Sequence, residues 1–151
     1  MKTVFFIAAL FAFGGCAYAQ PIAWTNPESA QALNRAKPKK YFVDVYTDWC
    51  VYCRKMDQTA FRDKGLAEFL NANYRPVKFN AEQRAYAHWN GAVYAYQTYG
   101  YRGFNQLAVY WLQGEMAFPT YVVISADGQT IEKRLIGFQT AADLKRQLSD
   151  N

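Results

Sequence analysis

Residues 41–56 of the chain read YFVDVYTDWCVYCRKM, and this stretch decides how the rest of the sequence is interpreted. Its first six residues are aromatic or β-branched apart from Asp44, which is typical of a short buried strand. Cys50 and Cys53 follow at once and open a predicted helix over about residues 50–59. The N–H groups of a first helical turn lack partners within the helix, so they would point at the Cys50 sulfur. Together with the helix dipole they favour the thiolate over the thiol.

The position of the two cysteines assigns each a different chemical role. A thiolate is the attacking species in disulfide exchange, so Cys50 is the expected nucleophile. Cys53 lies one turn later on the same face and can close the mixed disulfide, releasing the substrate. The alternative is half of a metal site, but zinc takes four ligands. The chain has no second cysteine pair and only one histidine, His88, so we expect no metal.

Residue patterns predict the other elements and a mixed α/β sheet with helices on both faces, because strands and helices alternate along the chain. A helix begins at Asn26-Pro27-Glu28 and runs to about Ala36, since these residues suit an N-cap and an acidic first turn. Further helices are predicted over 63–73, 102–112 (with Gly114 as C-cap) and 141–148. Further strands are predicted over 75–81, 120–125 and 130–136, the last two joined by a turn at 127–128.

The segment 82–103 is rich in tyrosine and tryptophan. Asn90-Gly91 predicts a hairpin there, because both turn positions need positive φ. Six aromatic residues are expected to pack across this hairpin and against the domain, although they could instead form a docking surface: Tyr86, Trp89, Tyr94, Tyr96, Tyr99 and Tyr101. His88 is expected at the surface rather than in a catalytic site.

The first nineteen residues have the pattern of a cleavable signal peptide. Lys2 precedes an apolar stretch over 4–13, and Ala17-Tyr18-Ala19 suits cleavage before Gln20, which leaves one domain over 20–151. An N-terminal anchor is the alternative, but no second run of membrane-spanning length follows. Residues 13–16 also resemble a lipobox, in which Cys16 would be lipidated. Either route exports the protein, and cleavage before Gln20 leaves only two cysteines.

Composition narrows the class of partner. Hydrophobic residues make up 52% of the 151 residues, which is enough for the core of one domain. The net charge of +5 is spread along the chain rather than gathered in a stripe, so we expect no nucleic-acid partner. We expect a monomer.

Several motifs together resemble the thioredoxin superfamily over about residues 30–148. Trp49 stands directly before the first cysteine and Asp44 six positions upstream of it, Phe118-Pro119-Thr120 enters a strand like the family's cis-proline motif, and Gly137 precedes the last helix. More narrowly, the chain resembles exported proteins related to the C-terminal domain of the DsbD family. The residues that carry this likeness are Asn80-Ala81-Glu82, Leu107-Ala108 and the stretch GEMAFPT over 114–120.

The resemblance implies a thioredoxin fold, an α/β domain with a central mixed sheet flanked by helices and an aromatic-rich hairpin inserted before the cis-proline strand. It implies Cys50, Cys53 and Asp44 as catalytic residues, with no cofactor beyond the cysteine pair. Burial should raise the pKa of Asp44, which could then exchange a proton with Cys53. The alternative is an aspartate that faces solvent.

Substrate-binding roles are implied for Trp49, Phe118, Pro119 and Thr120. A cis Pro119 would leave the Phe118 carbonyl and a nearby amide to hold a substrate chain in strand-like fashion. The alternative is an ordinary trans proline at a strand start. Trp49 could shield the disulfide and contact partners, or be a core aromatic.

We therefore expect an exported, periplasmic enzyme that reduces or exchanges disulfides in exported proteins, with a membrane electron donor of the DsbD kind. Val51-Tyr52 lacks both the Gly-Pro of cytosolic thioredoxins and the Pro-His of strong oxidants, so the direction of electron flow stays open, with the likeness favouring a reductant. The alternatives are a binding or chaperone module that uses the aromatic insertion, and a dedicated donor in cytochrome c maturation.

Overall fold

The computed structural model describes residues 20–150, so the predicted signal peptide and the lipobox at Cys16 lie outside the described residues. The elements are α1 (Pro27–Ala36), β1 (Lys40–Tyr46), α2 (Val51–Gln58), a 3₁₀ turn (Ala60–Arg62), α3 (Lys64–Asn73), β2 (Tyr74–Asn80), β3 (Ala87–Trp89), β4 (Ala92–Tyr94), β5 (Tyr96–Tyr99), β6 (Arg102–Asn105), α4 (Gln106–Trp111), β7 (Thr120–Ile124), β8 (Ile131–Ile136) and α5 (Ala141–Ser149). Within residues 20–150, no helix combines the length and apolar character that a membrane crossing requires.

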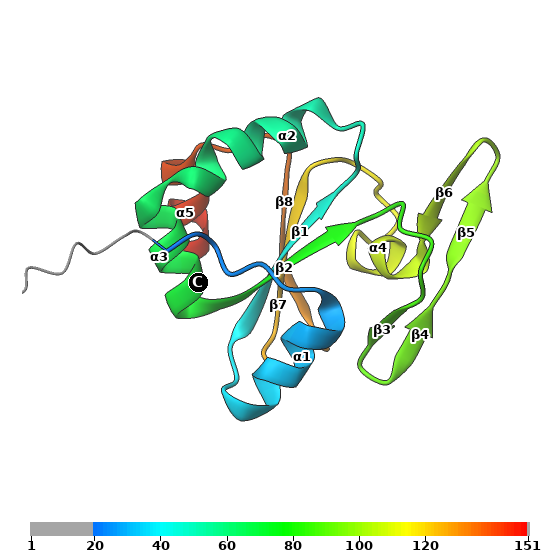
Figure 1. Cartoon of the computed structure of the whole chain (residues 1–151), viewed down its shortest axis with the longest axis horizontal. Coiled ribbons are helices and arrows are strands. Elements are labelled where there is room, and N and C mark those ends of the chain that lie inside the picture. Colours follow the sequence, from blue (N-terminus) through cyan, green and yellow to red (C-terminus); the bar gives the residue numbers. More distant parts are fainter. Residues whose placement is uncertain (1–19, 151) are drawn as a thin grey trace, which may run out of the picture.

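A four-stranded sheet in the order β2-β1-β7-β8 forms the centre of the domain (Figure 1). β1 runs parallel to β2 and antiparallel to β7, and β8 is antiparallel to β7. Helices α2, α3 and α5 lie on one face of the sheet, and α1 and α4 lie on the other (Figure 1). The predicted mixed sheet with helices on both faces is confirmed.

The central strand β1 is buried on both faces, because its side chains alternate between two hydrophobic clusters. Val43 and Val45 belong to the cluster on the α1 and α4 side, which includes Trp111. Phe42 belongs to the cluster on the α2, α3 and α5 side, which includes Met56. Asp44 shares the Phe42 face by the same alternation, so a carboxylate lies in the layer between β1 and α2.

The aromatic insertion forms two hairpins rather than one. β3 pairs with β4 around Asn90 (φ 48°) and Gly91 (φ 79°), so the predicted Asn-Gly turn is confirmed. β5 pairs with β6 in a second hairpin, which projects from the domain (Figure 1).

The predicted helix over 102–112 is wrong in its first four residues, because these form β6. Two local features explain the error. A Cβ on Gly103 would lie 2.3 Å from the Tyr96 hydroxyl oxygen, so a glycine at this position lets the two strands approach closely. The Asn105 side chain accepts the Leu107 N–H at 3.0 Å and is the N-cap that starts α4. The helix ends at its C-cap Leu112, so the prediction of Gly114 as C-cap is wrong by two residues. Gln113 (φ 52°) and Gly114 (φ 80°) follow in the left-handed region that leads the chain away from the helix.

Candidate active site

Cys50 and Cys53 form a disulfide at the N-terminus of α2, with their Cα atoms 5.3 Å apart. Cys50 is the N-cap of the helix, and the Cys53 N–H donates to its sulfur over 3.1 Å. This contact is the one predicted from the junction of strand and helix. Both cysteines are buried, at 4% and 5% exposure. The helix therefore presents a positive end to the Cys50 sulfur, which stabilises a thiolate there once the disulfide is reduced.

Asp44 is buried on β1 at 2% exposure, so the solvent-facing alternative is wrong. Burial raises the pKa of this carboxyl to about 6, although nearby Lys78 acts in the opposite direction. Its Oδ2 lies 3.2 Å from the Lys78 Nζ. Its Oδ1 is also buried and makes no hydrogen bond within residues 20–150. The carboxyl thus has one oxygen free to hold a proton.

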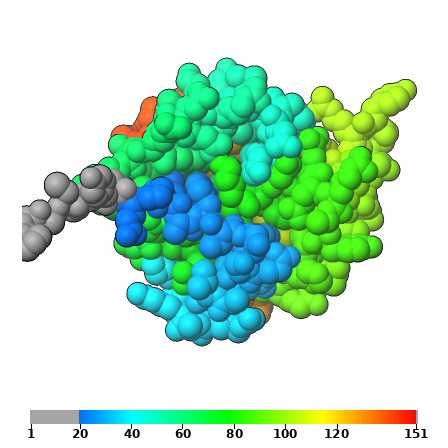
Figure 2. All heavy atoms as spheres, viewed as in Figure 1, coloured from blue at the N-terminus to red at the C-terminus, as the bar shows by residue number. Residues whose placement is uncertain are grey.

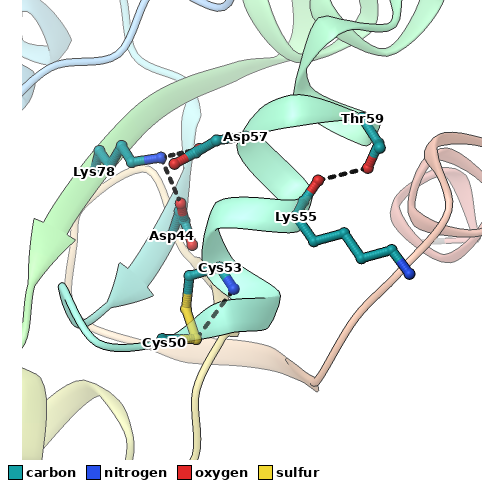
Figure 3. A network of polar contacts seen from close by, with 7 residues as sticks. All are labelled: Asp44, Cys50, Cys53, Lys55, Asp57, Thr59 and Lys78. Atoms are coloured by element: carbon teal, nitrogen blue, oxygen red, sulfur yellow. Dashed lines mark hydrogen bonds and ion pairs between the residues drawn. A yellow bond between two sulfur atoms is a disulfide. The ribbon is translucent and has the colours of Figure 1, made fainter.

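Lys78 and Asp57, which the sequence interpretation did not single out, complete a polar network behind the disulfide (Figure 3). Lys78 lies beside Asp44 in the register of the parallel strands β1 and β2. Its ammonium also binds the Asp57 carboxylate of α2. Burial opposes the charge on Lys78, but the two carboxylates outweigh it and raise the lysine pKa. Figure 3 shows this network on the Cys53 side of the disulfide.

Both residues had a signal in the sequence. Lys78 stands between Val77 and Phe79 in an apolar strand, so it must lie on the opposite face. Asp57 follows Cys53 by four residues in a helix, so it lies on the same helical face. That Lys78 would lie beside Asp44 depended on the strand register, and that Asp57 would reach Lys78 depended on the packing of α2.

Trp49, next to Cys50, is 48% exposed, so it is not a buried core aromatic. Its ring stands edge-on to Phe118, with the centroids 5.9 Å apart. The indole N–H donates to a Glu82 carboxylate oxygen at 2.9 Å, and the Arg102 guanidinium lies 4.8 Å from the ring centroid. Glu82 and Arg102 bracket the aromatic insertion, so the insertion fixes the indole beside the disulfide.

The Phe118–Pro119 peptide bond is cis, as expected, so the trans alternative is wrong. The backbone N–H and carbonyl of Phe118 take part in none of the hydrogen bonds formed within residues 20–150. Thr120 is buried, and its hydroxyl donates to the Ala117 carbonyl at 2.8 Å. The segment that leads into β7 is therefore held in place while the Phe118 backbone remains unpaired.

The remaining aromatic candidates divide between packing and exposure. Trp89 is buried and stands edge-on to Trp111, with centroids 5.0 Å apart. Tyr86, Tyr99 and Tyr101 are exposed. His88 is exposed on β3, as expected. Among residues 20–150, no cluster of three or more histidine, cysteine, aspartate or glutamate side chains could hold a metal ion.

Comparison with known proteins agrees with this geometry. The family model of the thioredoxin-like domain matches residues 27–151. The chain is 26% identical over 147 residues to the thiol:disulfide interchange protein DsbD of Klebsiella pneumoniae, a match that covers 93% of this chain and 21% of that protein. A shorter match to the Salmonella typhi DsbD, 39% identical over 46 residues, covers 30% of this chain and 8% of that protein. The chain thus spans at most about a fifth of these relatives' length.

Solved structures show the same fold at low sequence identity. A thioredoxin from Thermus thermophilus has a TM-score of 0.63 at 19% identity, and the match covers 87% of both chains. The oxidised C-terminal domain of Neisseria meningitidis DsbD has a TM-score of 0.57 at 16% identity, covering 82% of this chain and 90% of that one. These likenesses confirm the expected thioredoxin fold and the resemblance to DsbD.

Proposed function

Because the chain belongs to the thioredoxin-like family, we propose that it is an exported thiol-disulfide oxidoreductase. It reduces or exchanges disulfides in extracytoplasmic proteins through Cys50 and Cys53. The observation that carries this proposal is the Cys50–Cys53 disulfide at the start of α2, beside a buried carboxyl with a raised pKa. Proteins of this fold use the cysteine pair itself and need no cofactor.

The reduced protein begins the reaction with the Cys50 thiolate, which attacks one sulfur of a client disulfide. The client S–S bond breaks, a mixed disulfide forms, and the departing client sulfur takes up a proton. Cys53 then gives its proton to Asp44 and attacks the Cys50 sulfur. This step frees the second client thiolate and leaves the Cys50–Cys53 disulfide. Two electrons have passed from the protein to its client.

Asp44 is suited to the proton step for two reasons. A group with a pKa of about 6 can both accept and return a proton near neutral pH. Its unpaired Oδ1 gives that proton a place, either directly from Cys53 or through one water molecule. Lys78 and Asp57 position the carboxyl and set its charge.

The client chain is expected to pair with the backbone of Phe118, beside cis-Pro119. The free N–H and carbonyl of Phe118 support this arrangement, because an extended chain can add to such groups as a strand. Trp49 and Thr120 complete the binding site. Trp49 forms an exposed wall beside Cys50, and Thr120 fixes the loop that presents Phe118.

Electron flow towards clients requires that something reduce the disulfide again. The likeness to DsbD supports a membrane donor of that kind and an extracytoplasmic location. The equilibrium constant with glutathione measures the direction. A reductant should have a potential well below that of strong oxidants, and a value near about −120 mV would contradict this part of the proposal.

Trapping tests the assigned roles of the two cysteines. Cys53→Ser should leave Cys50 joined to clients in mixed disulfides that reducing agents release. Cys50→Ser is the matched control, because Cys53 does not occupy the N-cap position that stabilises a thiolate and should capture little. Equal capture by the two variants would contradict the assignment of Cys50 as the nucleophile.

A binding or chaperone module is the second candidate, and the exposed Tyr86, Tyr99 and Tyr101 favour it. Such a module would suppress aggregation of a reduced, unfolded client equally well after both cysteines are changed to serine. An oxidoreductase would lose insulin reduction in that double variant. The two assays on one variant therefore separate the candidates.

A further inference from the structure

A small apolar pocket lies between the β5–β6 hairpin and the end of α4. Its volume is ≈ 270 Å³, and it is lined by Tyr99, Phe104, Val109, Gly114 and Met116. The sites that hold whole small molecules usually measure about 300–1,000 Å³. This pocket therefore has room for roughly one large side chain.

The only side-chain polar group among these lining residues, the Tyr99 hydroxyl, already has partners. Gln106 donates to its oxygen at 2.9 Å, and the hydroxyl donates to the Gln97 side chain at 3.3 Å. A side chain that enters the pocket therefore meets rings, methyl groups and the Met116 thioether. Since Tyr99 is 52% exposed, its ring is an accessible wall. The chemistry of the pocket suits an apolar occupant.

A row of aromatic rings connects this pocket to the disulfide. The Phe104 ring, in the pocket wall, lies 6.0 Å from the Phe118 ring between centroids. Phe118 in turn lies 5.9 Å from Trp49, the residue before Cys50. Met116, also in the wall, precedes Phe118 by two residues. The pocket therefore continues the surface on which a client chain is expected to lie.

The β5–β6 hairpin is fixed relative to that surface. Arg102 on β6 stacks on the Trp49 ring at 4.8 Å, while Tyr99 on β5 closes the pocket. Figure 2 shows the tip of the hairpin as a yellow-green arm that stands out from the body of the domain. One hairpin thus contributes both to the wall beside Cys50 and to the pocket.

We propose that this pocket binds a large apolar side chain of the client polypeptide, close in sequence to the cysteine that Cys50 attacks. This inference rests on the proposed function and adds a sequence preference to it. An extended chain advances about 3.3 Å per residue. Met116 in the pocket wall lies only two residues before Phe118, beside which the client chain is expected to pair. The apolar residue of an extended client should therefore stand about two to four positions from the client cysteine.

A panel of peptides tests the preference without any variant. Each peptide is a serine-glycine chain with one cysteine, joined to glutathione by a disulfide, and one phenylalanine. Across the panel, the phenylalanine moves from five residues before the cysteine to five residues after it. The reduced protein should react about tenfold faster when phenylalanine stands two to four residues away on one side, because that ring is buried. Equal rates along the whole panel would overturn the inference.

Val109→Asp places a charge in the pocket and should abolish most of the phenylalanine preference. Val93→Asp is the matched control, because Val93 is 58% exposed on β4 in the other hairpin. Met116→Gln is a second pocket variant of similar size. Circular dichroism and thermal unfolding establish that each variant is folded, and the preference of Met116→Gln decides if Val109→Asp does not fold.

Glutathione disulfide, which lacks an apolar side chain near its cysteines, separates the two levels of the proposal. If the wild-type protein reacts with neither this compound nor any peptide, the proposed function fails and the inference falls with it. If it reacts with both but shows no preference, or if Val109→Asp and Val93→Asp keep the same preference, only the pocket inference fails.

Discussion

Replacing Asp44 by asparagine should stabilise the protein at neutral pH and leave its stability at pH 4 nearly unchanged. Burial raises the Asp44 pKa from 3.8 to about 6, so the folded state binds this proton more tightly than the unfolded state does. Between these two pKa values the unfolded chain loses the proton first. The free energy of unfolding therefore falls as the pH rises from about 4 to 6, and the loss is complete above that range.

The magnitude follows from the pKa values. A rise from 3.8 to about 6 corresponds to about 3 kcal/mol, because one pKa unit is worth about 1.4 kcal/mol. An asparagine amide and a protonated carboxyl present Lys78 with the same kind of neutral neighbour, so the two proteins should differ little at pH 4. Above pH 7 the variant should be more stable by up to about 3 kcal/mol.

Urea denaturation of the oxidised protein, from pH 4 to pH 8, measures this difference directly. Taking the variant minus the wild type removes the contribution of every carboxyl that the two share. Asp48→Asn, at an exposed position after the same strand, controls for the loss of one negative charge without burial. A difference between Asp44→Asn and wild type that stays constant across this range would refute the reasoning.

Two further variants test the surroundings of the site. Asp57→Asn should shift the Asp44-dependent fall in stability to lower pH, because the Asp57 carboxylate helps to raise the Asp44 pKa. A shift to higher pH in the same denaturation series would contradict this expectation. Asn105→Ala should cost about 2 kcal/mol in free energy of unfolding, because it removes the N-cap of α4 and the bond to the Ala85 carbonyl at 3.0 Å. A cost near that of an exposed Gln97→Ala control would contradict the second expectation.

The disulfide site was predictable in large part because its signals are local. Cys50 and Cys53 stand three residues apart at a junction between a strand and a helix, and neighbouring residues alone place an N–H group on the Cys50 sulfur. The burial of Asp44 followed from the apolar residues on both sides of it. The Asn90-Gly91 turn was predictable for the same reason, because positive φ is a property of the turn residues themselves.

The second hairpin was missed because its cause is not local. Residues 102–105 read as the start of a helix until they are paired with β5. That pairing depends on the close approach of Gly103 to Tyr96, which periodicity along the chain does not reveal. The aromatic set was divided in the same way, since Trp89 packs against the buried Trp111 whereas Tyr101 is exposed.

The sequence by itself determined which two sulfur atoms form the proposed redox pair and where the helix places them. Only the tertiary structure decided what controls those atoms. The register of two parallel strands brings Lys78 to Asp44, and α2 brings Asp57 to Lys78. The insertion likewise brings Arg102 to Trp49 from far along the chain. Charge and ring contacts act through space, so residues distant in sequence set the pKa and the walls of a site whose cysteines are neighbours.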